Sequence, residues 1–233
     1  MIWPARLIRH DHLDSTNSEA RRLAEAGERG PVWITAERQT AGRGRRGRAW
    51  EQGTGNLAAT LLLHPPGDFA QLSFAAALAV AEMAEAFAPK AAITVKWPND
   101  VLADGKKIAG ILLESGPGWL AIGIGVNLVS HPEGTEFPAA ALAQLGIAPP
   151  SSQEALALLA ARFAHWYDAW MNQGFETLRA AWLARAEGLG APIRARLPHE
   201  TRHGLFEGID AHGALLLNEQ GQVRAITAGE VFF

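Results

Sequence analysis

The sequence of 233 residues contains no cysteine. This absence excludes a disulfide framework, a zinc site built on cysteine and a thiol nucleophile. Residues 1–14 carry charges early and have no apolar segment of signal-peptide length. The longest apolar-rich stretch, 74–88, is interrupted by Glu82 and Glu85, so no membrane span is expected. These features predict a soluble protein of the cytoplasm.

The chain also lacks a large excess of charge of either sign. Its formal net charge is -3 at pH 7 and its pI is about 6.2. A general DNA- or RNA-binding protein carries a basic field over a whole face, so this class is disfavoured. Apolar residues make up 48% of the chain, which is enough for a sizeable core. The length fits one large domain, or one domain with a small satellite.

Hydrophobic periodicity and turn signals predict a mixture of helices and strands followed by a short β-rich segment. Helices are expected at 14–27, 69–88, 151–172 and 175–187. Strands are expected at 32–37, 56–63, 92–97, 107–115 and 119–128, the last two joined as a hairpin. Beyond 188–192 the strand-like runs are "PIRARL", "LFEGID", "ALLLNE" and "VRAITA". They indicate a small β-barrel or meander packed on the main domain, because about 45 residues form only a small core.

Residues 41–50, "AGRGRRGRAW", contain the spacing G-x-G-x-x-G, which begins at Gly42. A dinucleotide fingerprint requires a helix after the third glycine, and the glycine-rich residues 48–55 do not predict one. No acidic residue lies between Glu37 and Glu51. The arginines of this interval are Arg38, Arg43, Arg45, Arg46 and Arg48. One interpretation is an anion-binding loop, in which guanidinium groups and backbone N–H groups bind phosphate oxygens. The alternatives are a solvated basic loop and a short nucleic-acid-binding patch.

The segment "HETRH" at 199–203 matches the zinc-protease pattern H-E-x-x-H. That chemistry needs both histidines on one face of a stable helix. Pro198 and Gly204 leave room for about one helical turn, which is too short to be stable. We interpret the segment as a polar surface turn.

Further motifs occur in a fixed order: "LDSTN" (13–17), "KWPND" (96–100), "GKKIAGILLE" (105–114) and "GIGVN" (123–127). The first places hydroxyls and an amide at the start of a helix, and the third places Lys107 at the end of an apolar strand. Glycines inside a strand usually mean that another group lies against the backbone. Each motif alone is weak, and an isolated Lys107 would be read as a surface lysine. The combination predicts one functional site.

Together with "QTAGRGRRGRAW" (39–50), these motifs resemble those of biotin–protein ligases, the biotin–[acetyl-CoA-carboxylase] ligase family. The motif blocks cover about 11–63 and 93–128. The resemblance implies an α+β fold with a mixed β-sheet and packed helices, of the class II aminoacyl-tRNA synthetase-like type. It places a catalytic biotin- and ATP-binding domain over 1–188 and a small SH3-like β-barrel over 189–233, for which the match is looser.

The resemblance implies an ATP-dependent reaction in two steps. The carboxylate of biotin attacks the α-phosphate of ATP, giving biotinyl-5′-AMP and pyrophosphate. A lysine of a biotin carboxyl carrier domain then takes the biotinyl group and AMP leaves. Mg²⁺ is expected with ATP, without Cys or His ligands from the protein. A lipoate–protein ligase and a non-catalytic biotin-responsive binding protein are the alternatives, and Lys107 with the full arginine set favours catalysis.

The resemblance also implies the site residues. For biotin they are Ser15, Thr16, Asn17, Gln39, Gly42, Arg43, Gly44, Arg45, Lys107, Gly110, Gly123 and Gly125. For ATP and the adenylate they are Arg43, Arg45, Arg46, Arg48, Trp50, Asn99, Lys107 and Asn127. The catalytic residues expected are Arg45, Lys107 and Asp100. Asp100 would help the acceptor lysine, with a turn cap after Pro98 as the alternative.

The expected partner is the biotin carboxyl carrier domain of acetyl-CoA carboxylase or of a related carboxylase. Some family members carry an N-terminal DNA-binding domain, but "LDSTN" begins here at residue 13, so we expect neither DNA binding nor repressor activity. Family members can dimerise, and the sequence leaves the oligomeric state open. We expect residues 41–50 to be mobile without ligand and folded over biotinyl-AMP when it is bound.

Overall fold

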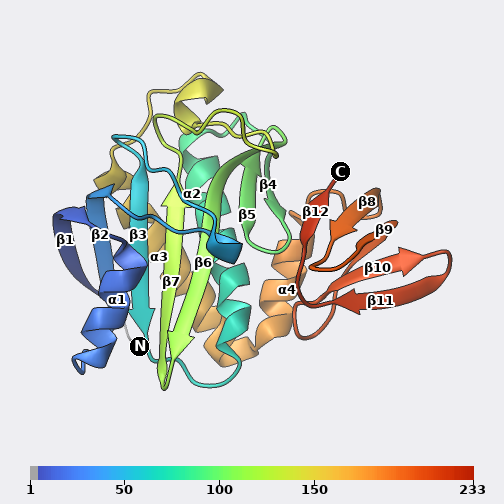
Figure 1. Cartoon of the computed structure of the whole chain (residues 1–233), viewed down its shortest axis with the longest axis horizontal. Helices are drawn as coiled ribbons and strands as arrows, with labels where there is room; N and C mark the ends of the chain where they lie inside the picture. Colours follow the sequence, from blue (N-terminus) through green and yellow to red (C-terminus); the bar gives the residue numbers. More distant parts are fainter. Residues whose placement is uncertain (1–4) are drawn as a thin grey trace.

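Two β-sheets and four α-helices make up the fold in the computed structural model, which describes residues 5–233 (Figure 1). The larger sheet has seven strands in the order β1-β2-β3-β7-β6-β5-β4. Their bounds are β1 Arg6–Leu13, β2 Val32–Gln39, β3 Leu57–Leu63, β4 Ile93–Lys96, β5 Asp100–Ala103, β6 Lys106–Gly116 and β7 Trp119–Val126. All neighbours in it pair antiparallel except β1 and β2, which are parallel. The sheet is therefore mixed, as expected.

The smaller sheet has five antiparallel strands in the order β11-β10-β9-β8-β12. Their bounds are β8 Pro192–Arg196, β9 Thr201–Ile209, β10 Leu215–Glu219, β11 Gln222–Ile226 and β12 Glu230–Phe232. The helices are α1 Thr16–Glu25, α2 Leu72–Phe87, α3 Ser152–Gln173 and α4 Phe175–Leu183.

The two faces of the larger sheet are covered differently. Side chains alternate between the faces along a strand, so Leu61, Ile111 and Ile124 join the main core under α2 and α3. On the opposite face, α1 covers a small apolar cluster that includes Leu62 and Ala121. Figure 1 shows α1 in front of the sheet, with α2 and α3 behind it. Because α1 is short, much of the central strands on its side stays available for a site.

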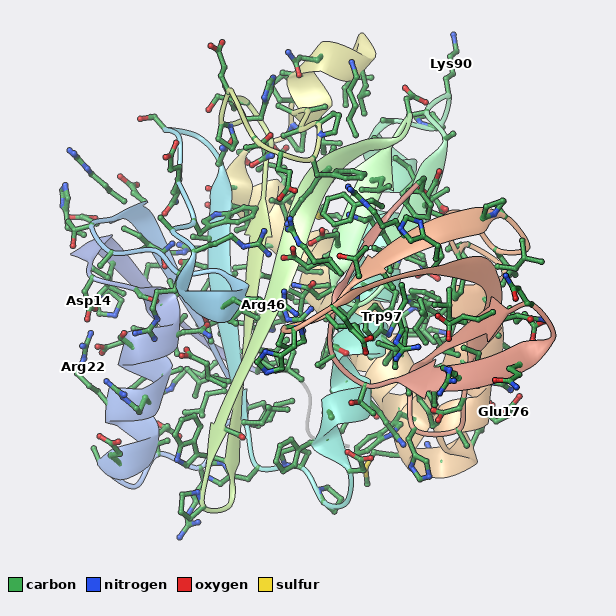
Figure 2. The ribbon with its side chains drawn as sticks, turned by 45° about the vertical axis from the view of Figure 1, so that its right-hand side comes forward. Asp14, Arg22, Arg46, Lys90, Trp97 and Glu176 are labelled. Atoms are coloured by element: carbon green, nitrogen blue, oxygen red, sulfur yellow. The ribbon has the colours of Figure 1, made fainter. Side chains whose placement is uncertain are left out.

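The smaller sheet packs on the same core as the larger one. Phe206 of β9 contacts Trp182 of α4 edge-to-face at a centroid distance of 6.5 Å, and Trp182 contacts Phe74 of α2 at 5.5 Å. The indole Nε1 of Trp97 donates to the carbonyl of Gly213 at 3.0 Å, where the two sheets meet (Figure 2). Aromatic burial of this kind fixes the position of the C-terminal strands next to β4 and β5.

Helix α2 is buried along most of its length because its alanine-rich sequence packs between the larger sheet, α3 and α4. The stretch Phe69–Phe87 is long and apolar enough to cross a membrane, with a mean hydropathy of 1.2, but 61% of it is buried inside the protein. Its apolar character is thus explained by its place in the core.

The expected helices and strands are confirmed with shifted ends, but the sequence analysis missed β1, β5 and β12. Strand β1 is a half-exposed edge with the polar sequence "RLIRHDHL", which has no apolar alternation. Strand β12 has three residues, too few for a pattern. The expected polar turn at 199–203 is wrong in part, because Thr201 begins β9 and only 198–199 bend. No helix forms there, which confirms the rejection of the zinc-protease pattern.

Candidate active site

A cavity of about 380 Å³ opens on the face of the larger sheet that carries α1. Its walls are the start of α1, strands β3, β6 and β7, the loop 41–50, the turn 96–100, the loop 130–139 and strand β12. Every predicted site residue lines this cavity except Gly42 and Arg46. The cavity residues that were not predicted include Lys96, Glu136, Phe137, Glu230 and Phe232. The structure therefore brings most of the predicted residues together in one place.

Small residues form the floor of the cavity. They belong to two rows of residues paired across the strands, Ala58–Gly125–Gly110–Asp100 and Thr60–Gly123–Leu112. A Cβ atom at Gly123 would lie 2.2 Å from Asn17 Oδ1, and one at Gly125 would lie 2.3 Å from the Trp50 indole. The glycines inside β7 thus allow Asn17 and Trp50 to approach the backbone closely, as a glycine in a strand interior predicts.

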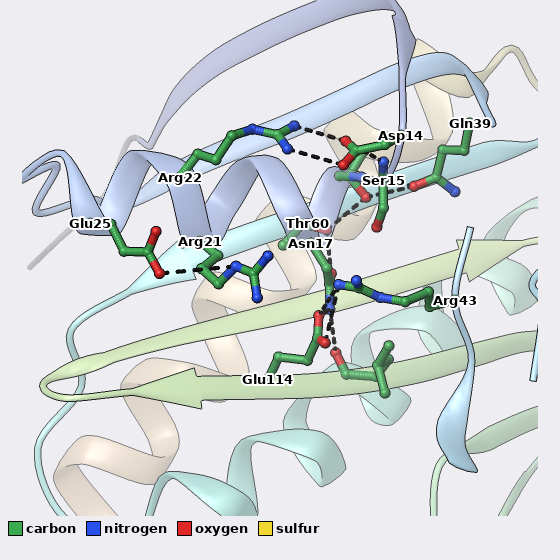
Figure 3. Close-up of polar contacts among 12 residues, drawn as sticks. Asp14, Ser15, Asn17, Arg21, Arg22, Glu25, Gln39, Arg43, Thr60 and Glu114 are labelled. Atoms are coloured by element: carbon green, nitrogen blue, oxygen red, sulfur yellow. Dashed lines mark hydrogen bonds and ion pairs between the residues drawn. The ribbon is translucent and has the colours of Figure 1, made fainter. Parts of the chain in front are cut away.

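One end of the cavity is polar and pre-organised by the start of α1. The oxygen Oε1 of Gln39 accepts a hydrogen bond from the backbone N–H of Thr16 at 2.8 Å. The hydroxyl of Thr60 lies 2.8 Å from Thr16 Oγ1 and donates to Asn17 Oδ1 at 2.6 Å. The amide Nδ2 of Asn17 donates to Glu114 Oε2 at 2.8 Å (Figure 3). Hydroxyls and amides that both donate and accept suit a ligand with the same double character.

The arginine-rich loop 41–50 crosses in front of β7 and β6 (Figure 1). It contains a bridge between Arg43 and Ala49 and one 3₁₀ turn, Arg45–Gly47, with no helix after it. Its G-x-G-x-x-G spacing is therefore no dinucleotide fingerprint. Gly42 lies at the base of the loop, where its carbonyl accepts from Trp50 N at 3.0 Å. Arg46 is exposed, has a φ of 57° and is not among the residues that line the cavity.

Three arginines of this loop contact three different parts of the fold. Arg45 is half-buried, and its Nη1 donates to Asn99 Oδ1 at 3.3 Å. Its burial lowers the pKa of the guanidinium, which still stays charged at neutral pH. The pairs are Arg43–Glu114, Arg45–Asn99 and Arg48–Glu230. These contacts hold the loop over the cavity.

Two lysines flank Asp100 in the middle of the cavity. Lys107 Nζ lies 2.6 Å from Asp100 Oδ1, and Lys96 Nζ lies 3.9 Å from Asp100 Oδ2. Lys96 is 5% exposed, and its ammonium sits 3.5 Å from the centre of the Phe137 ring. Burial lowers the pKa of Lys96 to about 8, with Asp100 acting in the opposite direction. Asp100 begins β5 and its carboxylate pairs with the lysines, so its observed contacts are not those of a turn cap.

The pKa of Lys96 predicts a pH-dependent stability. Between about pH 8 and pH 10.5 the folded protein has released this proton and the unfolded chain still holds it. The free energy of unfolding of the wild type should therefore rise across this interval relative to Lys96→Met, and the difference should be flat below pH 8. Urea unfolding at several pH values measures it. Lys90→Met, on an exposed lysine, controls for the loss of one charge, and parallel wild-type and Lys96→Met curves would contradict the prediction.

The C-terminal sheet completes one wall of the cavity. Glu230 of β12 has a side chain that is 12% exposed and pairs with both Arg48 and Arg196. Burial raises the pKa of Glu230, but the two guanidinium groups lower it more, so the carboxylate is ionised. Arg196 also pairs with Glu136 of the loop 130–139 at 2.6 Å. The sequence analysis assigned no site residue beyond 188, because nothing local in "TAGEV" shows that this strand faces the cavity.

Two buried polar atoms of cavity-lining residues have no hydrogen-bond partner within residues 5–233: Asn127 Oδ1 and Trp50 Nε1. The other amide atom of Asn127, Nδ2, donates to the carbonyl of Ala140 at 3.1 Å. Buried polar groups are nearly always paired, so an unpaired acceptor and an unpaired donor at a cavity wall fit groups of a bound molecule.

Comparisons with known proteins identify the family of the chain. The model of the biotin/lipoate A/B protein ligase family matches residues 11–128, and that of the biotin protein ligase C-terminal domain matches residues 188–233. The chain is 48% identical to the biotin–[acetyl-CoA-carboxylase] ligase of Paracoccus denitrificans, over 94% of this chain and 97% of that protein. It is 34% identical to the protein of the same name from Mycobacterium tuberculosis, over 93% of this chain and 85% of that protein.

Among solved structures, the biotin protein ligase from Aquifex aeolicus in complex with biotin and ATP superposes with a TM-score of 0.86. The sequence identity is 28%, and the match covers 97% of both chains. The chain therefore belongs to the biotin/lipoate A/B protein ligase family, as the resemblance of its motifs predicted, and is a ligase.

Proposed function

We propose that the protein is an ATP-dependent biotin–protein ligase that forms biotinyl-5′-AMP and then transfers the biotinyl group to a lysine of a biotin carboxyl carrier domain. The observation that carries this proposal is that one cavity is lined by a polar end, by the arginine-rich loop and by the Lys107–Asp100 pair. The names of its relatives and the biotin and ATP in the Aquifex structure support it.

Biotin would lie along the floor with its ureido ring at the polar end. A urea donates through two N–H groups and accepts through its carbonyl, which matches the hydroxyls and amides of Thr16, Asn17 and Gln39. Asn17 and the Trp50 indole pack against Gly123 and Gly125, and the bicyclic ring and the acyl chain would lie beside these two side chains. Trp50 lies next to Lys107, and its unpaired Nε1 would donate to the acyl chain's carboxylate.

The nucleotide would occupy the other end of the cavity. An oxygen of the biotin carboxylate attacks the α-phosphorus, the bond to the bridging oxygen of the β-phosphate breaks, and pyrophosphate leaves. Lys107 and Arg45 would stabilise the charge that develops at the α-phosphate, because fixed cations in a water-poor cavity act more strongly than in water. The unpaired Oδ1 of Asn127 would accept from a hydroxyl or amino group of the adenosine.

In the second step the amine of the acceptor lysine attacks the acyl carbon, the acyl–phosphate C–O bond breaks, and AMP leaves. A free lysine side chain has a pKa of about 10.4, so its ammonium must lose a proton first. We propose that Asp100 orients this ammonium and accepts the proton. Its position next to Lys107 places it beside the point where the acyl phosphate would lie.

Mg²⁺ would enter with the nucleotide. Of the cavity carboxylates, Asp100, Glu136 and Glu230 are each paired with lysine or arginine, and Glu51 is exposed at the end of the loop. Within residues 5–233 no group of three or more His, Asp or Glu is placed to hold a metal ion. Such a cationic cavity fits a magnesium ion carried mainly by the phosphates, where it would neutralise charge on the leaving pyrophosphate.

We further propose that the C-terminal sheet is a small SH3-like barrel, that the catalytic domain is of the class II aminoacyl-tRNA synthetase-like type, and that the boundary lies near residue 188. Glu230 and Phe232 would then make the small domain a part of the nucleotide end of the site. The protein would act in the cytoplasm on a carboxylase carrier domain.

ATP–pyrophosphate exchange tests the proposed function most directly. Biotin should stimulate the exchange and lipoate should not, and labelled biotin should appear on an isolated carrier domain but not on its acceptor-lysine-to-arginine variant. Exchange with lipoate alone would support a lipoate–protein ligase. Biotin binding without exchange or AMP release would support a binding protein. Specific operator binding by the purified protein would contradict the predicted absence of repressor activity.

A further inference from the structure

Glu114 is the last residue of the "GKKIAGILLE" segment, and no role follows for it from the predicted site. It lies on β6, on the same face of the sheet as Gly110 and Leu112, because side chains two apart share a face. Its Oε2 accepts from Asn17 Nδ2 at 2.8 Å, and its two oxygens accept from Arg43 Nη2 at 3.1 and 3.0 Å (Figure 3). The Glu114 carboxylate thus connects the polar end of the cavity, through Asn17, to the arginine-rich loop, through Arg43.

The contact with Asn17 fixes which way its buried amide faces. Asn17 is 4% exposed, and its Oδ1 accepts from Thr60. Among the residues that the structure describes, its Nδ2 contacts only Glu114 and, at a long 3.4 Å, the carbonyl of Leu112. A flipped amide would set its oxygen against the Glu114 carboxylate. Glu114 therefore determines where the Asn17 amide presents its donor and its acceptor at the polar end of the cavity.

The contact with Arg43 serves a different purpose. The side chains of Arg43 and Glu114 are 39% and 36% exposed, and an ion pair with such exposure adds little to overall stability. It does restrict the position of the first arginine of the loop, which has no other hydrogen-bond partner among the described residues. The pair therefore acts on the loop's position more than on the fold.

We propose that Glu114 is a positioning residue that couples the polar end of the cavity to the loop 41–50. It orients Asn17 for the ureido ring and holds Arg43 over the bound biotin. The biotin part of this inference rests on the proposed function; the contact with Arg43 does not. Glutamine at this position keeps an acceptor for Asn17 but loses the charge that holds Arg43, whereas alanine loses both. The two substitutions therefore separate the two contacts.

Trypsin cleavage of the intact protein after the loop arginines, with and without biotin, tests the coupling. In Glu114→Gln the loop should be cleaved about 2–5-fold faster without ligand, and saturating biotin should protect it less than in the wild type. Glu114→Ala should in addition weaken biotin binding about tenfold or more, measured by calorimetry, because a buried amide loses its charged partner. Glu25→Gln, which removes an exposed Arg21–Glu25 pair on α1, is the matched control and should resemble the wild type.

Cleavage and biotin protection equal to the wild type in Glu114→Gln would overturn the coupling. A lowered Tm with faster cleavage along the whole chain would also overturn it, because Glu114 would then act on stability. If the wild type itself does not bind biotin, the proposed function fails, and the ligand-free cleavage rate still decides whether Glu114 holds the loop.

Discussion

Replacing Arg45 by alanine is expected to lower biotin-dependent ATP–pyrophosphate exchange by about 10²–10³-fold. Arg45 is a half-buried arginine of the loop, its guanidinium contacts Asn99, and the charge of Asp100 acts on it. Two anions, a carboxylate and a triphosphate, must meet at this point, so removal of a fixed cation raises the barrier of the first step. Exchange kinetics at saturating biotin and ATP measure the effect.

The fold should survive this substitution, because Arg45 contributes a surface loop contact and no core packing. We expect a Tm within about 2 °C of the wild type, since such surface changes are usually within ±0.5 kcal/mol. Arg45→Lys should recover part of the activity, because lysine restores the positive charge but not the bidentate hydrogen bonding of the guanidinium. Arg38→Ala, on an exposed arginine of β2 outside the cavity, is the control. Normal exchange by Arg45→Ala would remove the catalytic role from the loop.

Elements with a local pattern could be predicted from the sequence. The hairpin of β6 and β7 follows from two apolar runs around 116–118, and α3 begins at the capping box formed by Ser151 and Glu154. The motifs also predicted most of the cavity, because each of them lies at an end of a strand, at the start of a helix or along a strand of the cavity wall. The local sequence was sufficient to predict a site residue where the strand or helix that carries the residue also places it at the cavity.

Contacts between distant segments could not be predicted in the same way. Arg43 and Glu114 are 71 positions apart, and Arg48 and Glu230 are 182 positions apart. Nothing local to Glu114 or Glu230 distinguishes either of them from an ordinary acidic side chain on a strand. The partners of the loop arginines depend on where the sheets place their strands, which a single sequence does not state.

The place of the Trp50 side chain could not be predicted from the sequence either. The resemblance implied Trp50 among the residues for ATP and the adenylate, and this role stays a prediction. In the structure its indole lies against Gly110 and Gly125 on the floor of the cavity. The mobility of the loop without ligand stays a prediction, which the trypsin experiment addresses.

Lys107→Met is the second change with a large expected effect. It should reduce adenylate formation about 10²–10³-fold, because it removes the point charge proposed for the α-phosphate. It also leaves Asp100 without its 2.6 Å partner and with only Lys96 at 3.9 Å. Methionine keeps the length and apolar stem of lysine, so packing beside Trp50 is preserved.

The two effects of Lys107→Met can be separated by the step that is measured. Single-turnover formation of biotinyl-AMP reports the lost charge, and transfer from supplied biotinyl-AMP to the carrier domain reports the disturbed Asp100. If the unpaired Asp100 carboxylate causes part of the loss in adenylate formation, the double variant Lys107→Met, Asp100→Asn should form adenylate faster than Lys107→Met alone. His199→Ala, on an exposed turn of the C-terminal segment, should leave both steps unchanged. Adenylate formation within twofold of the wild type in Lys107→Met would contradict the role of Lys107, because no other residue described here places an ammonium as close to Asp100.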